Sequence, residues 1–158
     1  MPLTIREATL ADLPRLPDLF DYNDVPAMIA EHSRRISTGE FSIFLLLEDG
    51  DLIGELHVTW RSDDPRFAVA GQRAYLSAFR VRKDKQGVGF GSFLLDSVIR
   101  IIDQGMYQEI TVGVEDDNPR ARHMYETRGF TERIARCCES YQGDSYEFDL
   151  LLRIQPKG

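Results

Sequence analysis

The sequence predicts an α/β fold in which a mixed sheet carries helices on both faces. Strongly β-prone runs at 41–48 and 52–60 flank Asp49-Gly50, a pair typical of a hairpin turn because glycine tolerates positive φ. Residues 89–104 repeat apolar side chains at helical spacing. Strand and helix patterns follow one another as β-α-α-β-β-β-α-β-α-β-β, an order typical of a mixed sheet covered by helices.

The chain is expected to begin with a strand at residues 3–6 and a helix at 10–20. Thr9 or Asp12 would cap this helix, and Pro14 fits its first turn. Pro17 does not fit, so the helix is predicted to be short or bent. Its buried side would consist of leucines at helical spacing: Leu13, Leu16 and Leu19.

A second helix is expected to follow Asp24 as its cap, with Pro26 in the first turn. Its apolar positions are Met28, Ile29 and Ile36. The hairpin at 41–60 comes next, and alternation in its second arm predicts two faces. One face would carry Leu52, Leu56, Val58 and Trp60, and the other Ile53, Glu55, His57 and Thr59.

The second half begins with a polar loop at 61–72 and a strand at 74–81. The helix at 89–104 should end at Gly105. A strand at 110–114, a short helix at 119–128 ended by Gly129, and strands at 130–135 and 146–154 complete the chain. The buried stripe of the long helix is predicted to be Leu94, Leu95, Val98, Ile101 and Ile102. With no linker or repeat, residues 1–158 are expected to form a single domain.

The net charge of −7 comes from 19 basic and 26 acidic residues. A net anion is not attracted to polyanions, which argues against nucleic-acid or anionic-membrane partners. The N-terminus lacks the pattern of a secretory signal, and no apolar run approaches the ~20 residues of a membrane span. The neighbouring Cys137 and Cys138 are poorly placed for a disulfide and have no companion metal ligands. We therefore expect a reduced, cytoplasmic protein without a metal.

The most informative segment is 81–92, which is predicted to run from a strand through a glycine-rich loop into a helix. Gly87, Gly89 and Gly91 allow close approach of a ligand to the backbone. The unpaired amides and dipole at the start of the next helix favour an anion such as phosphate. A local excess of positive charge adds to this, from Arg80, Arg82, Lys83 and Lys85 against Asp84. The ordinary alternative is a flexible turn with solvated basic residues.

Two common phosphate loops do not match this segment. A Walker loop needs Lys-Ser/Thr directly after its last glycine, where Ser92-Phe93 stand here. The dinucleotide pattern G-x-G-x-x-G, counted from Gly87, places Ser92 at its last glycine.

The segment instead resembles the Q/R-x-x-G-x-G/A motif of the GNAT superfamily of N-acetyltransferases, with Gln86, Gly89 and Gly91 at its defining positions. A second segment, from Asn118 to Phe130, is similar to the family's N-x-x-A-x-x-x-Y-x-x-x-G-F, with Ala121 and Tyr125 in place. The resemblance implies a mostly antiparallel central sheet of six or seven strands, two splayed parallel strands and four helices.

The resemblance also implies acetyl-CoA as acyl donor and a small-molecule or peptide amine as acceptor. The backbone of Phe79 and Val81 would pair with the pantetheine arm, and Asn118 would hydrogen-bond to it. The Val81 N–H is a plausible oxyanion donor, and Tyr125 a plausible general acid beside the sulfur. The pyrophosphate would be held by backbone amides of the loop and helix start: Gly87, Val88, Gly89, Phe90, Gly91 and Ser92.

A general base is not evident. Some relatives carry a glutamate six residues before the valine, but Tyr75 stands there. Glu55 and His57 are candidates on a neighbouring strand, although solvent-facing strand residues are a slightly favoured explanation. Glu115 and Asp116 are further candidates, with an acidic loop cap as the simpler view. A water chain without a dedicated base is also possible.

The acceptor should meet the polar segments 20–24 and 139–144. Phe20 and Tyr22 among acids would suit an ammonium, and helix caps with surface charge are the alternative. Two other functions remain open: a non-catalytic acyl-CoA-binding or regulatory domain of the same fold, and a nucleotide-binding module. Self-association into a homodimer through the last strands is also conceivable.

Overall fold

The computed structural model describes residues 2–156, in which seven strands form one sheet in the order β1-β2-β3-β4-β5-β7-β6. Neighbouring strands run antiparallel except for β4 and β5, which are parallel. The strands are β1 (Leu3–Glu7), β2 (Phe41–Glu48), β3 (Asp51–Thr59), β4 (Arg73–Val81), β5 (Glu109–Glu115), β6 (Glu132–Tyr141) and β7 (Asp144–Ile154). The helices are α1 (Val25–Ser37), α2 (Phe90–Gln104) and α3 (Pro119–Glu126), with 3₁₀ segments η1 (Leu10–Asp18) and η2 (Lys83–Lys85). The expected mixed α/β fold is confirmed.

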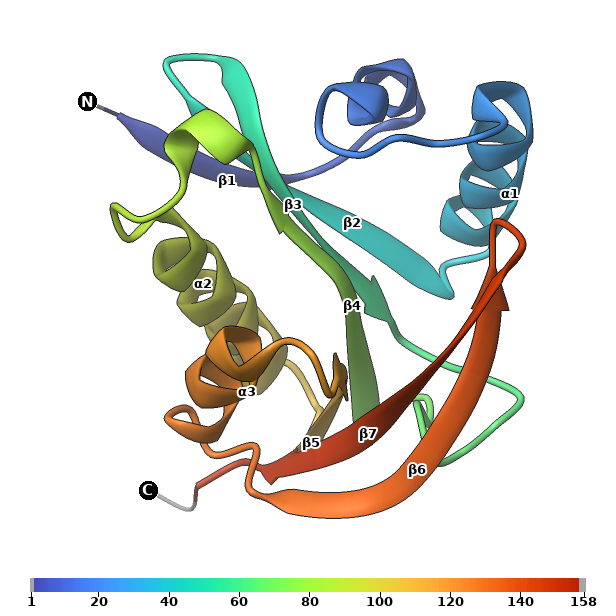
Figure 1. Cartoon of the computed structure of the whole chain (residues 1–158), viewed down its shortest axis with the longest axis vertical. Helices are drawn as coiled ribbons and strands as arrows, with labels where there is room; N and C mark the ends of the chain where they lie inside the picture. The colour runs from blue at the N-terminus through green and yellow to red at the C-terminus, as the bar shows by residue number, and fades with distance from the viewer. Residues whose placement is uncertain (1, 157–158) are drawn as a thin grey trace.

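Helices cover both faces of the sheet, as expected. In Figure 1, α2 and α3 lie together on the left, whereas η1 and α1 lie on the opposite side. Each face has its own apolar core, because the sheet separates the two layers. The core under α2 and α3 includes Leu76, Leu94 and Phe130, and the core under η1 and α1 includes Leu13 and Ile43.

The parallel strands β4 and β5 separate halfway along their length. They pair only from Arg73 opposite Glu109 to Leu76 opposite Val112. Beyond this point β4 stays with β3, while β5 stays with β7. A bulge helps β4 to turn away, since Ala78 has a φ of 51° and the register with β3 shifts beside it. The gap between the strands is the splay that the resemblance implied.

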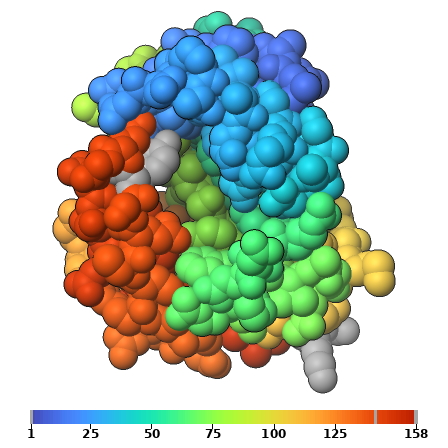
Figure 2. Space-filling model, turned by 90° about the vertical axis from the view of Figure 1, so that its right-hand side faces the viewer, coloured from blue at the N-terminus to red at the C-terminus, as the bar shows by residue number. Residues whose placement is uncertain are grey.

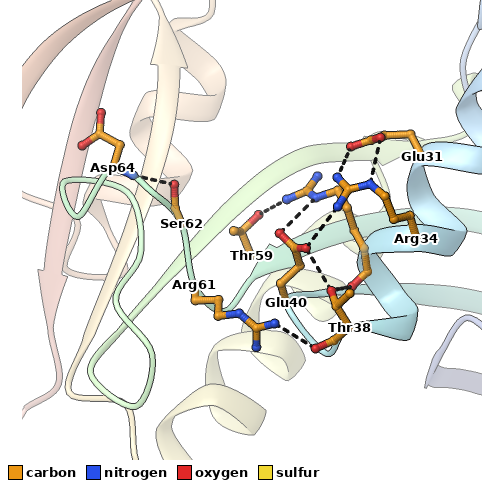
Figure 3. Close-up of polar contacts among 9 residues, drawn as sticks. Glu31, Arg34, Thr38, Glu40, Thr59, Arg61, Ser62 and Asp64 are labelled. Atoms are coloured by element: carbon orange, nitrogen blue, oxygen red, sulfur yellow. Dashed lines mark hydrogen bonds and ion pairs between the residues drawn. The ribbon is translucent and has the colours of Figure 1, made fainter.

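The turn and cap predictions are confirmed at the first hairpin and at α1. Asp49 and Gly50 have φ values of 52° and 86°, which suit the two-residue turn between β2 and β3. The side chain of Asp24 accepts a hydrogen bond from the amide of Ala27 at 3.0 Å and caps α1. At the other end of α1, Thr38 donates a hydrogen bond to Glu40 at 2.9 Å, and its carbonyl accepts one at 2.9 Å from Arg61 in the loop after β3 (Figure 3).

The segment predicted as a helix at 10–20 is a 3₁₀ helix. Pro17 has no amide hydrogen, and its ring would clash with an α-helical carbonyl four residues earlier. A 3₁₀ helix has three residues per turn, so Leu13 and Leu16 still share one face, and both are fully buried.

Two predictions of buried faces were wrong. On α2 the buried residue is Ile99, while Ile101 is 40% exposed because it lies at the edge of the apolar stripe. On β3, Leu52 packs under η1, and Ile53 packs under α2 with Leu56. The cause is a bulge, since Leu46 pairs with residue 54 and the next residue of β2 pairs with Leu52.

The polar segment 139–144 is a hairpin rather than a loop. Strands β6 and β7 continue to a two-residue turn at Gln142 and Gly143, whose φ values are 52° and 88°. The side chain of Gln142 accepts a hydrogen bond from the amide of Asn23 at 2.9 Å and donates one to the carbonyl of Asp21 at 3.3 Å. These bonds tie the hairpin tip to the segment between η1 and α1.

Both cysteines are free thiols, with Cys137 buried and Cys138 exposed. Within residues 2–156, no helix has the length and apolar composition needed to cross a membrane.

Replacing Asp12 by Ala is expected to destabilise the protein in a pH-dependent way. Arg6 donates to both carboxylate oxygens at 2.7 and 2.9 Å, and the Thr9 amide donates at 2.7 Å. The Arg6 contact holds the pKa of Asp12 well below its usual range. At pH 7 the free energy of unfolding should fall by about 2 kcal/mol, since charge-assisted bonds are lost.

A lowered native pKa means that the stabilisation is present above the unfolded pKa of about 3.9 and disappears as the pH falls below it. The difference between wild type and Asp12→Ala, measured by urea unfolding, should therefore shrink below pH 4. Asp63→Ala, at an exposed loop position, serves as control. A difference that stays constant down to pH 2 would contradict the assigned ion pair.

Candidate active site

The loop after β4 has the backbone geometry of an anion site. Gly87 and Gly89 have φ values of 81° and 93°, in the region that favours glycine. Gly89 is the N-cap of α2 and offers no side chain to its first amides. The amides that open this 15-residue helix therefore point toward the space in front of the loop.

A cavity of about 230 Å³ lies in front of this loop, between the splayed end of β4 and helix α3. It brings together most of the residues that the sequence predicted for a cofactor. Its lining contains Phe79, Val81, Gln86, Gly87, Gly89, Gly91, Ser92 and Asn118, together with Arg120, Ala121 and Met124. Val88 is 67% exposed, and Phe90 packs against the core, so the side chains of these two predicted residues lie elsewhere.

Two of the lining side chains hold the backbone in place. Gln86 donates to the carbonyl of Val81 at 2.8 Å, which fixes the end of β4 against the loop. The side-chain oxygen of Asn118 accepts a hydrogen bond from the amide of Ala121 at 3.1 Å and caps α3. The amide nitrogen of Asn118 makes no side-chain hydrogen bond within the described part of the chain, and it is the group left to donate to a ligand.

The local excess of positive charge predicted at residues 80–85 is largely neutralised by nearby carboxylates. Arg82 donates to Asp84 at 2.7 Å, and Nζ of Lys85 lies 2.7 Å from Glu48. Arg80 points to the other face of β4, since alternate side chains leave opposite faces of a strand.

The cations that remain near the loop are Lys83 and Arg120, neither of which has an ion pair within residues 2–156. Arg120 was missed in the sequence. Its place two residues after the Asn118 cap was visible in the sequence, but only the fold shows that this helix faces the glycine loop.

Tyr125 lies behind the cavity rather than on its lining. It is 5% exposed, and its ring lies 6.3 Å from that of Phe79 and 5.9 Å from that of Phe130. Burial raises the pKa of Tyr125 above its ordinary value, so the phenol stays protonated through the neutral range. A less acidic phenol acts as a hydrogen-bond donor to sulfur more readily than as a full proton donor.

The candidate bases differ sharply in environment. Glu55 and His57 are buried, at 0% and 5% exposure, which makes the explanation as solvent-facing residues wrong. The reason is that η1, α1 and the β6–β7 hairpin cover this face of β3 (Figure 1). Asp116 forms a two-point ion pair with Arg136 that lowers the pKa of this carboxyl, whereas Glu115 is exposed at the end of β5.

The rings of Phe20 and Tyr22 were considered from the sequence as contacts for the ammonium of an acceptor, but a side chain of the protein already occupies them. The guanidinium of Arg80 lies 3.7 Å above the ring of Phe20 and donates to the Tyr22 hydroxyl at 2.9 Å. The cation on these rings is therefore the protein's own. Within residues 2–156, no group of three or more His, Cys, Asp or Glu side chains is arranged to hold a metal ion.

A family model described as acetyltransferase (GNAT) family matches residues 8–130, which is most of the chain. The chain belongs to the GNAT family of acetyltransferases. Both segments that resembled the family motifs fall within this match. No curated protein matches this GNAT chain significantly.

Solved structures agree with the family at the level of the fold. Ribosomal-protein-alanine N-acetyltransferase from Brucella melitensis is 20% identical, with a TM-score of 0.74 over 96% of this chain and 99% of that one. Mutant forms of the spermidine/spermine N-acetyltransferase SpeG from Vibrio cholerae are 19% identical, with a TM-score of 0.74 over 98% and 95%. The structure of yncA from Salmonella typhimurium, with its cofactor acetyl-CoA, is 21% identical, with a TM-score of 0.71 over 99% and 95%.

Proposed function

We propose that this GNAT protein is an N-acetyltransferase that moves the acetyl group of acetyl-CoA to a primary amine within a ternary complex. The observation that carries the proposal is the continuous cavity from the glycine loop to the splayed end of β4. The family match supports acyl transfer, and one relative of the same fold was solved with acetyl-CoA. The free cysteines fit a reducing compartment such as the cytoplasm.

The cavity fits the parts of acetyl-CoA in order. The amides from Gly87 to Ser92 would hold the pyrophosphate, with Lys83 and Arg120 supplying positive charge. The backbone edge of Phe79 and Val81 would pair with the pantetheine arm in the place that β5 has left. The amide nitrogen of Asn118 would donate to the same arm.

Strand geometry directs one backbone donor toward the reacting carbonyl. Arg82 donates its N–H to the carbonyl of Ile53 in β3 at 2.8 Å. Because successive N–H groups of a strand point to opposite edges, the N–H of Val81 points into the splay. There it can stabilise the oxyanion of the tetrahedral intermediate. Tyr125, whose ring lies directly behind that of Phe79 at 6.3 Å, would donate a hydrogen bond to the leaving sulfur from behind the wall of the cavity.

Gly89→Ala is expected to weaken acetyl-CoA binding about tenfold. An added Cβ would meet nothing within 4 Å, so the effect comes from the positive φ alone. An L-residue there costs about 1–2 kcal/mol, and 1.4 kcal/mol is a tenfold change in affinity. Titration calorimetry with acetyl-CoA measures the change.

Gly39→Ala is the matched control, because Gly39 has a φ of 78°, equally open surroundings and a position between α1 and β2, away from the cavity. It should lose similar stability but keep its affinity. Equal affinities for the two variants would contradict the assigned loop.

Thiol release with a panel of amines tests the transfer itself. Absence of acetyl-CoA binding at millimolar concentration would overturn the proposal. Binding without turnover on any amine would support the non-catalytic acyl-CoA-binding alternative, which the missing carboxylate at Tyr75 keeps open. Displacement of acetyl-CoA by ATP would support a nucleotide-binding module instead.

A further inference from the structure

A second cavity lies on the opposite face of β4 from the glycine loop. It is enclosed by α1, β3, β4 and the β6–β7 hairpin, and Figure 2 shows it as a hollow between the blue N-terminal segments, the green loop after β3 and the orange hairpin. Its volume is about 350 Å³, enough for a small molecule. Aromatic and charged side chains share it: Tyr22, His32, Arg35, Phe41, His57, Tyr75, Arg80, Glu139 and Tyr146.

The first feature of this cavity is a buried pair at its base. Nε2 of His57 lies 2.5 Å from Oε1 of Glu55, and the other oxygen of Glu55 lies 3.5 Å from Arg80. Because a carboxylate only accepts hydrogen bonds, this contact places the imidazole proton on Nε2. Nδ1 then carries the lone pair, and no hydrogen bond to a described residue occupies this atom at the cavity lining.

The second feature is an imidazole that has no hydrogen-bond partner among the described residues. Both ring nitrogens of His32 are buried and have no hydrogen bond within residues 2–156. The ring stands edge-on to that of His57, with centroids 5.4 Å apart. Burial lowers the pKa of His32 to about 4, so it is neutral at pH 7. Unsatisfied buried polar atoms are costly, which points to a polar ligand that completes them.

The third feature is the charge of the lining, which carries two guanidinium groups and one carboxylate. Burial lowers the pKa of Arg35. Its guanidinium donates to the Thr59 hydroxyl at 3.2 Å and lies 4.1 Å from the centroid of the Phe41 ring, but its contact with the carboxylate of Glu40 is long at 3.9 Å. Its positive charge therefore has only a long carboxylate contact, and such a guanidinium suits an anionic ligand group. The carboxylate of Glu139 already accepts a hydrogen bond from Tyr146. A polyamine with several ammonium groups would therefore find little complementary charge.

We propose that this cavity binds the amine acceptor, that the acceptor is a small monoamine which also carries an acidic group, and that His57 takes the proton from its ammonium. This inference rests on the proposed function. Phe79 lines the first cavity and Arg80, the next residue of β4, lines the second. Because β4 and β5 stop pairing after Leu76, the gap between these two strands joins the two faces of the sheet. An acceptor in the second cavity would reach a thioester carbonyl beside Val81 through this gap.

The proton balance is as follows. An N–H bond of the ammonium breaks, and its proton moves to Nδ1 of His57, whose imidazolium form Glu55 stabilises. The freed lone pair forms the C–N bond to the thioester carbonyl, and the C–S bond breaks. A second proton from the nitrogen ends on the sulfur, which gives the amide and the CoA thiol. The imidazolium then releases its proton to solvent.

Matched acceptor pairs test the substrate class. Each pair contains an amino acid and its decarboxylated amine, such as phenylalanine with phenethylamine and tryptophan with tryptamine, with spermidine added as polyamine. In at least one pair, we expect the amino acid to have a kcat/KM about ten times that of its decarboxylated amine. The same amino acid should raise the melting temperature of the protein–CoA complex. Preference for the amine in every pair, or for spermidine, would overturn this class.

Neighbouring arginines of α1 supply a matched control. Arg35→Met should abolish the preference for the acid. Arg34→Met should keep it, because Arg34 is 59% exposed and paired with Glu31 at 2.8 Å (Figure 3). An unchanged preference in Arg35→Met would contradict the assigned role of this guanidinium.

The pH profile of His57→Gln tests the proton transfer. Among the residues that the structure describes, the other titratable or charged groups around His57 are His32, Arg35, Glu55, Tyr75, Arg80, Glu139, Tyr22 and Tyr146. We expect kcat/KM to fall about 100-fold at pH 7 and the deficit to shrink toward alkaline pH, where the amine loses its proton unaided. A purely structural role would lower the rate equally at every pH and would overturn the proposal, as would a wild-type profile.

Acetyl-CoA binding by calorimetry separates failure of this inference from failure of the proposed function. His57→Gln should bind acetyl-CoA as wild type does, and an acetyl-CoA affinity lowered with the rate would contradict the placement of His57 on the acceptor side. Should this variant fail to fold, Glu55→Gln preserves the side-chain shape and should show a similar pH-dependent deficit. Wild-type protein that does not bind acetyl-CoA would instead overturn the proposed function itself.

Discussion

Tyr125→Phe is expected to lower kcat about 100-fold with little change in acetyl-CoA affinity, in line with loss of a general-acid or hydrogen-bonding group. The substitution removes only the hydroxyl. The ring keeps its place, 6.3 Å from Phe79 and 5.9 Å from Phe130, and it does not line the cavity in front of the glycine loop. The lost interaction would be the proposed hydrogen bond to the leaving sulfur. Steady-state thiol release and calorimetry on the same preparation provide the two numbers.

The raised pKa of Tyr125 also predicts how the effect of Tyr125→Phe depends on pH. The phenol remains protonated from pH 6 to 9, so the ratio of wild-type to variant rate should be constant over that range. Tyr107→Phe, at a tyrosine that packs against Trp60 on the same side of the sheet, should keep the wild-type rate. An unchanged kcat in Tyr125→Phe across this range would refute a role for the hydroxyl.

Phe130→Ala is expected to reduce the free energy of unfolding by about 3–5 kcal/mol, which is the usual cost of emptying a buried aromatic site. Phe130 is fully buried in the core beneath α2 and α3 and packs edge-on against Tyr125. The melting temperature should fall by about 10 °C for a chain of this size. Urea unfolding and calorimetry measure both quantities.

The same deletion at an exposed site provides the comparison. Phe93 on α2 is 42% exposed, and Phe93→Ala should cost less than about 1 kcal/mol. Phe130→Ala should also lower kcat at pH values below 9, where the Tyr125 phenol is protonated. The reason is that Tyr125 loses the neighbouring ring that holds it beside Phe79. Equal losses of stability at the two phenylalanines would show that the core beneath α3 is not packed as described.

Features that depend on consecutive residues were predictable from the sequence. The positive φ of Gly89 and the start of α2 just after it follow from local geometry. The same holds for the Asp49-Gly50 turn and for the cap that Asp24 provides. The pair Gln142-Gly143 forms a turn of the same kind as Asp49-Gly50, but the polar residues around it were interpreted as a loop.

Charge was the feature that the sequence described least well. The basic residues at 80–85 suggested a phosphate site by their number, yet Arg82 and Lys85 are paired with carboxylates. A count of charges along the chain includes no partners from distant strands, such as Glu48 of β2. Arg120 was overlooked for the same reason, because only the fold brings α3 against the glycine loop.

The sequence alone determined the family, the order of the elements and the loop proposed to bind acetyl-CoA, because each follows from short-range spacing and backbone preference. Only the tertiary structure decided whether the side chains of Glu55 and His57 are exposed or buried. A bulge in β3 and a second bulge in β4 set which face these side chains occupy, and α1 and the hairpin then bury them. The surroundings of His57 include His32 and Arg80, 25 and 23 positions away along the chain, and such contacts depend on packing rather than on pattern.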